Sequence, residues 1–369
     1  MRRGASLTGS VSSVLACGIA VLGLAGCGAG SRPVTAATPG TSAAATTTAT
    51  ATTTTVTTTE TTTTTTTTTA TETVTLPGAG RPPVTIGDEN TPEQFLLGQL
   101  YYQALKAQGF SVALNQSIGP PEVIQQAMAT GQLAMYPEYL DTWDSTVAGI
   151  QRSFRSRRDA YLAGQQYALK HGLVLLNPTP FSDTNAIAVT FDYAVENNVQ
   201  SITDLMSVAS PPVMLGGPPQ FQASPTGLPA IEQTYGVTPA AFKPLELGAP
   251  QYQALDNGTV QAAVVSTTDP QLLSGGYPLL ADPQDVFGWG NVVPVASVRV
   301  LDEEGPAFEA TIDRVSALLT LPMMRELNAA VEIDGQDPAA VATQFLQFEG
   351  VLPQPTTTTS TPSSTSTTG

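Results

Sequence analysis

The sequence predicts an α/β fold, in which a mostly parallel sheet carries helices on both of its faces. Short strand-like segments and longer helix-like segments alternate between residues 84 and 265, the pattern of successive βα units. Helix caps and turn residues separate these segments. The chain has 369 residues, more than one domain usually contains, so we expect two lobes.

The first βα unit shows these features most clearly. An apolar strand is expected at residues 84–86. Thr91, Pro92 and Gln94 then fit a capping box, with Thr91 as the N-cap, Pro92 at the first helical position and Gln94 at the third. Apolar residues follow at helical spacing until Gly109, a residue suited to the left-handed conformation that ends a helix.

Later segments continue the alternation. The expected strands are 112–114, 133–136, 174–176, 213–217 and 260–265. The expected helices are 121–131, 159–171, one that starts at Ser201 with Asp204, and a helical C-terminal stretch from about 306 to 348.

The first 27 residues are expected to be a lipoprotein signal peptide. Arg2 and Arg3 precede an apolar run that is too short to span a membrane. The run ends in Leu-Ala-Gly-Cys, a lipobox whose Cys27 would be acylated, which anchors the chain on the extracytoplasmic face of the cell membrane. An ordinary secretory signal with an incidental cysteine is the alternative. Because Cys17 lies within the signal, the mature domain has no thiol left for a disulfide, a nucleophile or a metal site.

Two threonine-rich segments flank the folded part. Residues 28–81 and 353–369 contain few aliphatic side chains, so they cannot bury enough apolar surface to offset the entropy of ordering. We expect both segments to be disordered. The first would space the folded domain from the membrane, with its threonines open to glycosylation. A β-aggregating threonine tract is the other interpretation.

The charge of the chain argues against a nucleic-acid role. The net charge is −16 at pH 7, whereas phosphate binding needs clustered lysine and arginine. The single basic cluster is interpreted as a solvated helix start or a contact with a partner protein, and it consists of Arg152, Arg155, Arg157 and Arg158.

No enzyme, cofactor or metal site is expected. The chain lacks a G-x-S-x-G elbow, a P-loop and an H-E-x-x-H motif. Its single histidine, His171, is placed to act as a cation at a helix C-terminus. Glu138, Asp141 and Asp144 are spaced by three and could form a metal cluster on one helical face, although a solvated acidic loop is the favoured interpretation.

The stretch from Val84 to Trp143 resembles a known family. It opens with VTIGDENTPEQ and closes with GQLAMYPEYLDTW. In these motifs it is similar to the glycine betaine/choline (osmoprotectant) substrate-binding proteins of ABC importers, and the similarity continues more weakly to about Leu352. The resemblance implies a type II periplasmic-binding-protein fold, whose two hinged lobes close around a ligand. Its expected parts are lobe one at 82–183 plus 292–352, lobe two at 184–291, and crossings near 186–190 and 291–300.

The resemblance also implies a binding site. In this family tyrosines surround a quaternary ammonium group, while Gln, Thr, Lys and Arg side chains hold the carboxylate. Gln94 matches the glutamine of the family's TEQ motif, and Tyr139 and Thr142 match EYTGT, which here reads EYLDT. Gln94 is equally well explained as a capping residue. Tyr139 could be a core aromatic, although its polar loop favours the pocket.

Several positions depart from the family's motifs. Glu89 replaces the lysine of SKNFTEQ, Asn185 the tyrosine of NDTYAL, and Ser266 the tyrosine of AYSTD. Ser224 replaces an arginine, and Gly290 replaces the last cage tyrosine, although the neighbouring Trp289 could supply a ring. The predicted ligand-binding residues are Gln94, Tyr139, Thr142, Asn185, Ser266 and Trp289.

Together these features predict the extracytoplasmic solute-binding component of an ABC importer. It would capture a quaternary amine or a related solute between its lobes and present it to the permease and ATPase subunits. Each lost ring removes about 0.5–2 kcal/mol of cation–π attraction. An alternative is therefore the same fold with specificity drifted to a non-betaine cation or a polyol. A surface sensor or interaction lipoprotein is a further alternative.

Overall fold

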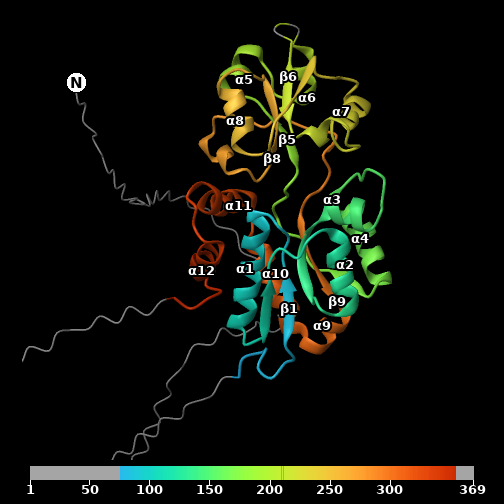
Figure 1. Ribbon diagram of the computed structural model, residues 1–369, viewed down its shortest axis with the longest axis vertical. Coiled ribbons are helices and arrows are strands. Elements are labelled where there is room, and N and C mark those ends of the chain that lie inside the picture. Colours follow the sequence, from blue (N-terminus) through green and yellow to red (C-terminus); the bar gives the residue numbers. More distant parts are fainter. Residues whose placement is uncertain (1–74, 209, 211, 355–369) are drawn as a thin grey trace, which may run out of the picture. The chain divides into compact units, whose positions relative to one another are not determined.

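The computed structural model describes residues 75–354 except 209 and 211. Cys27, the expected signal peptide and nearly all of the threonine-rich segments lie outside the described residues. Just before the first strand, the backbone N–H of Gly78 donates to the carbonyl oxygen of Gln108 at 2.9 Å. The described chain contains two sheets, each with its own helices (Figure 1).

The first sheet has five strands in the order β2-β1-β3-β9-β4. Strands β1, β2 and β3 are parallel, whereas β9 runs antiparallel to both of its neighbours, β3 and β4. The bounds are β1 Val84–Gly87, β2 Val112–Asn115, β3 Met135–Tyr139, β4 Leu173–Leu175 and β9 Val292–Ser297. We call this sheet and its helices lobe one.

The second sheet has four strands in the order β5-β8-β6-β7. Strands β6, β7 and β8 are parallel, and β5 runs antiparallel to β8. The bounds are β5 Asn185–Ala188, β6 Met214–Gly217, β7 Ala241–Pro244 and β8 Ala262–Ser266. We call this sheet and its helices lobe two. Each sheet is therefore mostly parallel, as expected, with one reversed strand.

In each sheet the reversed strand is the one that follows a connection from the other sheet. Strand β5 follows residues 176–184, and β9 follows residues 267–291. Both strands enter their sheet at the edge where the parallel strands end, so they must run back across it. The segments expected to be crossings, 186–190 and 291–300, are largely these two strands themselves, and the crossings lie just before them.

The two connections are hydrogen-bonded to each other. Ser182 and Asn291 form an antiparallel bridge. The Asn291 side chain is buried, and its Nδ2 donates to the carbonyl oxygens of Thr179 at 3.0 Å and Phe181 at 2.8 Å. An amide that ties both connections together fixes where the chain can bend.

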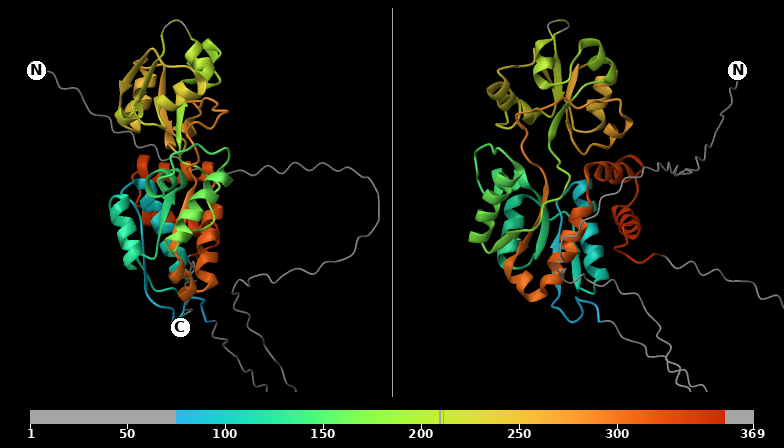
Figure 2. Two further views of the ribbon diagram at one scale, coloured as in Figure 1. Left: turned by 90° about the vertical axis from the view of Figure 1, so that its right-hand side faces the viewer. Right: turned by 180° about the vertical axis from the view of Figure 1, so that it is seen from behind.

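Helices cover both faces of the first sheet. The sequence of β9 is apolar on both of its sides, as a strand buried between two layers of helices requires. Val292 and Ala296 pack into the core under α1, α10, α11 and α12, while Val293 and Val295 pack into the core under α2 and α4. Figures 1 and 2 show α12 beside α1, with which it packs. The bounds are α1 Pro92–Ala107, α2 Pro121–Thr130, α3 Leu140–Thr142, η1 Trp143–Val147, α4 Arg157–Lys170, α9 Val298–Glu304, α10 Pro306–Leu318, α11 Leu321–Asn328, η4 Ala329–Ile333 and α12 Pro338–Phe348.

The second sheet is also covered on two faces. Val264 packs into one core with helices α6 and α7, and Val265 packs into the other with α8. The bounds are α5 Phe191–Asn197, α6 Ile202–Ser207, η2 Pro219–Gln222, α7 Leu228–Tyr235, α8 Ala249–Asp256 and η3 Pro270–Ser274. In lobe two, the elements additional to those expected from the sequence are α5, η2, α7, α8, η3 and strand β7.

The two helix starts expected from capping residues differ: the start of α6 has a complete capping box and the start of α1 has half of one. Ser201 and Asp204 bond reciprocally at the start of α6. At the start of α1, Thr91 Oγ1 accepts the Gln94 backbone N–H at 3.3 Å, but the Thr91 N–H donates to the Glu89 carbonyl oxygen rather than to Gln94. The expected capping role of the Gln94 side chain is therefore wrong.

Among the described residues, no helix combines the length and apolar composition needed to cross a membrane.

Candidate functional site

Five of the expected binding residues lie where strands or helices begin or end. Gln94 is in the first turn of α1, Tyr139 ends β3, and Thr142 ends α3. Asn185 begins β5 and is the register partner of Ser266, which ends β8. In α/β folds ligands bind at this edge of the sheet, outside the carboxyl ends of the strands.

Gln94 is the most informative of them. Its side chain is completely buried, yet neither its Oε1 nor its Nε2 makes a hydrogen bond with the described part of the chain. The amide lies beside the Tyr139 hydroxyl. A buried polar group left without a partner costs about 1–3 kcal/mol, so an amide held this way is prepared to bond to a molecule that enters the site.

A hydrogen-bonded chain of side chains surrounds Gln94. The Tyr139 hydroxyl donates to Glu93 Oε1 at 2.9 Å, and Asn328 Nδ2 donates to Glu93 Oε2 at 2.7 Å. Asn328 lies at the end of α11, far from Glu93 in sequence, and its Nδ2 also donates to the Thr268 carbonyl oxygen at 3.2 Å. The C-terminal helices therefore complete the site, because they supply Asn328.

The second lobe and the connections continue this network. The Ser266 hydroxyl donates to Asp183 Oδ1, and Ser266 Oγ lies 3.0 Å from Thr268 Oγ1. Asp269 Oδ2 accepts from the Tyr252 hydroxyl at 2.8 Å and from the Ser266 backbone N–H at 3.2 Å. Ser266 thus bonds to two carboxylates at once.

The other expected residues line a cavity. Thr142, Asn185 and Trp289 lie in the wall of a cavity of about 360 Å³, a volume within the range of small-molecule sites. The Trp289 Nε1 is buried and makes no hydrogen bond with the described residues. Gln94, Tyr139 and Ser266 are outside this lining. The structure therefore forms two groups, which the pairing of Asn185 with Ser266 connects.

Gly290 explains one of the departures from the family's motifs. A Cβ atom at this position would lie 1.7 Å from the Asp183 carbonyl oxygen, and the Gly290 carbonyl accepts the Asp183 N–H at 2.9 Å. No tyrosine fits here without separating the two connections. The only ring available from this connection near the cavity therefore belongs to Trp289 or Phe287.

The carboxylates of the site repel one another. Burial raises the pKa of Glu93, Asp183 and Asp269, and the nearby Asp269 and Glu93 raise the pKa of Glu93 and Asp183 further. Among the described residues the one ion pair joins Arg299 and Glu303 on α9. The donors that bond to the site's carboxyl groups are neutral hydroxyl and amide groups, so the site is rich in carboxyl groups and no ion pair in the described part of the chain offsets them.

The acidic run begins in β3 and continues into α3 and η1, and it is largely buried, so its interpretation as a solvated loop is wrong. Glu138 is completely buried and Asp144 is 3% exposed. Burial raises the pKa of Asp141 to about 6 and that of Asp144 to about 7, and it raises that of Glu138 strongly. Glu89, which stands at the family's lysine position, adds to the rise at Glu138. Among the described residues, no group of acidic, histidine or cysteine side chains is arranged to hold a metal ion.

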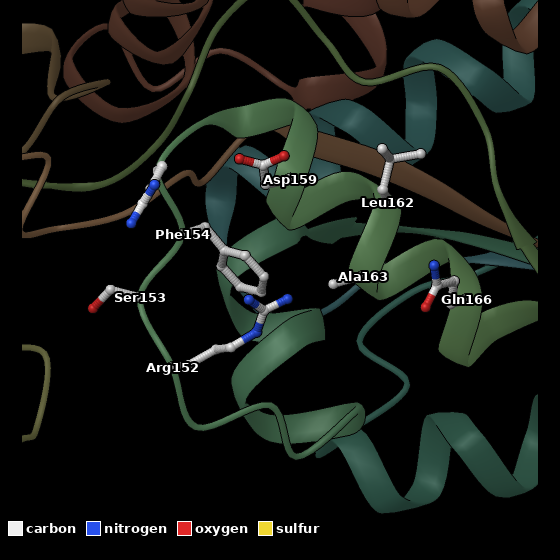
Figure 3. Close-up of a pocket in the computed structure, with 8 residues that line it drawn as sticks. Arg152, Ser153, Phe154, Asp159, Leu162, Ala163 and Gln166 are labelled. Atoms are coloured by element: carbon white, nitrogen blue, oxygen red, sulfur yellow. The ribbon is translucent and has the colours of Figure 1, made fainter.

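A second cavity, of about 480 Å³, lies on lobe one beside the start of α4 (Figure 3). Its wall includes Arg152, whose guanidinium carbon lies 4.6 Å from the centre of the Phe154 ring. The basic cluster is exposed, and Ser156 caps α4 just before Arg157. His171 caps the other end of α4. These residues match the expected solvated helix start and helix end.

Sequence reasoning missed several residues of the site. Glu93 and Asp183 stand at the Glu of TEQ and the Asp of NDTYAL, so the motifs could have pointed to them. Asn328 and Tyr252 lie in helices with no motif, and only the fold brings them to the site. Thr142 and Trp289, by contrast, were expected and line the cavity.

Comparison with known proteins identifies the family of the chain. Residues 82–347 match the family described as the substrate binding domain of ABC-type glycine betaine transport systems. The chain is 30% identical over 280 residues to a glycine-betaine-binding protein of Pseudomonas aeruginosa, covering 72% of this chain and 88% of that one. It is 28% identical over 299 residues to the glycine betaine-binding protein YehZ of Escherichia coli, covering 75% and 94%.

Solved structures show the same fold. The crystal structure of a glycine betaine/carnitine/choline ABC transporter protein has a TM-score of 0.66 at 21% identity, covering 73% of this chain and 99% of that one. Apo YehZ from Escherichia coli has a TM-score of 0.63 at 26% identity, with the same coverage. The fold is that of type II periplasmic binding proteins. The chain belongs to the family of substrate-binding domains of ABC-type glycine betaine transport systems, solute-binding transport proteins that work outside the cytoplasm.

Proposed function

We propose that the chain captures a small solute between its two lobes and presents the closed form to an ABC permease, with the transport energy supplied by the partner ATPase. The lobes, residues 82–183 plus 292–352 and residues 184–291, would move about the connections bridged by Ser182 and Asn291. Catalysis has no part in this role.

The observation that carries the proposal is the buried, unbonded amide of Gln94 beside Tyr139. Lobe one would hold the solute with Gln94, Tyr139 and Thr142. Asn185, Ser266 and Trp289 would close over it from lobe two and the connection into β9. The relatives named as glycine-betaine-binding proteins support a quaternary amine or a related small molecule as the solute.

A thermal-shift panel of glycine betaine, choline, carnitine, small amines and polyols tests this function on the purified full chain. A solute present at a hundred times its dissociation constant stabilises the native state by about 2.7 kcal/mol. Such a shift, lost on Tyr139→Ala, supports the site. A solute that binds equally well to the Tyr139→Ala protein contradicts it.

We further propose that Cys27 is acylated and anchors the chain to the membrane. The lipobox before Cys27 supports this part of the proposal. Labelling with an alkyne-bearing fatty acid, in cells producing the chain or its Cys27→Ala variant, tests it. Label on the Cys27→Ala protein would contradict acylation at this residue.

A further inference from the structure

The acidity of the site points to the chemical class of its ligand. This inference rests on the proposed function, because it concerns the same site. Glu93, Asp183 and Asp269 lie within electrostatic range of one another. None of them forms an ion pair within the described residues, and hydroxyl and amide donors alone bond to their side chains. Desolvated like charges of this kind favour the arrival of a cation.

Two arginines act on acidic groups of the site, but neither acts on Glu93 or Asp183. Arg325 lowers the pKa of Asp269, and its Nε donates to the Thr267 carbonyl oxygen at 2.8 Å. Arg152 is exposed, stacks on Phe154 and acts on Asp144. Glu93 and Asp183 therefore keep no cationic partner. The positions at which the family's motifs carry Lys and Arg hold Glu89 and Ser224 instead.

Hydrogen-bond acceptors without donors lie in the same place. Gln94 Oε1 and Asn328 Oδ1 are both buried and make no hydrogen bond within the described residues, and the Gln94 Nε2 donor, also unbonded, is free to bond to a ligand hydroxyl. Both residues border Glu93, one as its neighbour in α1 and the other through the 2.7 Å bond to its Oε2. An N–H group would satisfy these acceptors, whereas an N-methyl group would leave them unbonded in a buried site.

A quaternary ammonium group needs aromatic surface, and most of the expected cage positions hold no ring. Tyr139 is the one tyrosine kept at an expected cage position, and the opposite positions are Asn185, Ser266 and Gly290. A trimethylammonium group makes no hydrogen bonds, so it depends on ring faces. A primary ammonium group bonds directly to carboxylates, through short charge-assisted hydrogen bonds.

We propose that the ligand is a small protonated amine that carries N–H donors and no carboxylate group, in the class of ethanolamine and the short diamines. Its ammonium group bonds to the acceptors gathered around Glu93. A zwitterion is disfavoured because its carboxylate enters a site crowded with carboxylates. A neutral polyol leaves their repulsion uncompensated.

Isothermal titration of the purified full chain separates these classes with matched probes. Ethanolamine and choline share one skeleton and one positive charge, and they differ only in N–H versus N-methyl groups. Glycine betaine adds the carboxylate, 1,4-diaminobutane adds a second ammonium group, and myo-inositol carries no charge. We expect ethanolamine or the diamine to bind at least about tenfold more tightly than choline, since buried acceptors left unbonded cost that much. Glycine betaine and myo-inositol should bind more weakly still.

Variants locate the ammonium group. Glu93→Gln should weaken amine binding by roughly a hundredfold, as expected when one partner of a buried charge pair is removed. Asp183→Asn provides a second, independent test if Glu93→Gln fails to fold. Glu196→Gln is the matched control, because Glu196 is exposed on α5 and away from the site; it should leave binding unchanged.

The outcomes distinguish the inference from the function on which it rests. Tight glycine betaine or choline binding that is lost on Tyr139→Ala overturns the inference and leaves the proposed function standing. Amine binding that is unaffected by both Glu93→Gln and Asp183→Asn also overturns the inference. If neither amine binds at millimolar concentration, the ligand class is wrong.

Discussion

The two sides of the proposed site differ in how they are built. The lobe-one side presents residues that match the family's motifs, Gln94, Tyr139 and Thr142. Of these, Tyr139 is held in a hydrogen-bonded network with Glu93 and Asn328. The opposite side presents short side chains, Asn185 and Ser266, where the motifs have tyrosines. In the proposed site, the ligand-anchoring groups therefore belong to lobe one and the proposed change of specificity belongs to lobe two.

The difference follows from where each side gets its support. The Gln94 side is fixed by α1 and by helices from the far end of the chain, which pack into one core with the first sheet. Asn185 and Ser266 stand at the ends of two paired strands, beside the connections. Side chains at such ends can change without disturbing a core, so specificity can drift there while the fold is kept.

Gln94→Met is expected to have the largest effect, and it tests the anchoring side. The variant should weaken ligand binding by about 10–100-fold, because the amide's hydrogen bonds to the ligand are lost. It should also stabilise the ligand-free protein by about 1–3 kcal/mol, since an unbonded buried amide is replaced by an apolar side chain of similar size. Titration calorimetry and urea unfolding measure the two effects.

Gln166→Met provides the control, because Gln166 is exposed on α4. It should change neither affinity nor stability appreciably. If Gln94→Met destabilises the ligand-free protein while Gln166→Met does not, the amide of Gln94 has an internal structural role and is not held ready for a ligand.

The buried acids predict a stability that falls as the pH rises. The pKa of Asp144 is raised from 3.8 to about 7 and that of Asp141 to about 6, mainly by burial. Between about pH 4 and pH 7 the folded state therefore binds more protons than the unfolded state. The free energy of unfolding must then decrease through this window and level off above it. Thermal melts of the ligand-free chain at pH 5 and pH 8 should show the lower melting temperature at pH 8.

Asp144→Asn is the sharper form of this test. An asparagine is nearly the same size as an aspartate and does not titrate. The free energy of unfolding of the variant should therefore depend less on pH, and at pH 8 it should compare more favourably with that of the unmodified chain than at pH 5. Asp141 and Arg152, which act on Asp144, remain in place. A variant with an unchanged slope would show that Asp144 does not carry the effect.

Asn185→Tyr tests the lobe-two side by restoring a ring. One added ring should improve choline binding by about 0.5–2 kcal/mol. Asn185→Leu adds bulk without a π-face, so it should not reproduce this gain. An equal gain in choline affinity from both variants would mean that choline binding depends on added apolar surface rather than on cation–π attraction.

Local patterns predicted much of lobe one and less of lobe two. Thr91 and Gly109 bracket a strongly periodic helix, and α1 ends at Ala107, close to that expectation. Strand β7, whose sequence is AFKP, and the eight-residue helices α7 and α8 carry too little periodicity to be recognised. Short elements are held by tertiary packing, which sequence patterns do not display.

The site was predictable only where a motif marked it. Gln94 and Tyr139 were found through the resemblance, but their partner Asn328 is 235 positions from Glu93 in the chain. Gln94 also shows how two explanations can compete. Its capping position was compatible with both a local and a ligand role, and only its unbonded buried amide distinguishes them.

The smallest expected effects come from two helix caps, one in each lobe. Thr91→Ala removes the cap of α1 in lobe one, and Ser201→Ala removes that of α6 in lobe two. Each should lower the free energy of unfolding by about 0.5–2 kcal/mol.

If the lobes unfold as one unit, both variants lower the midpoint temperature of the same transition, because the bridged connections couple the two sheets. If they unfold separately, each variant shifts a different transition, and a ligand that binds both lobes should merge them again. Calorimetric scans of both variants, with and without ligand, therefore measure how strongly the two sides of the site are coupled.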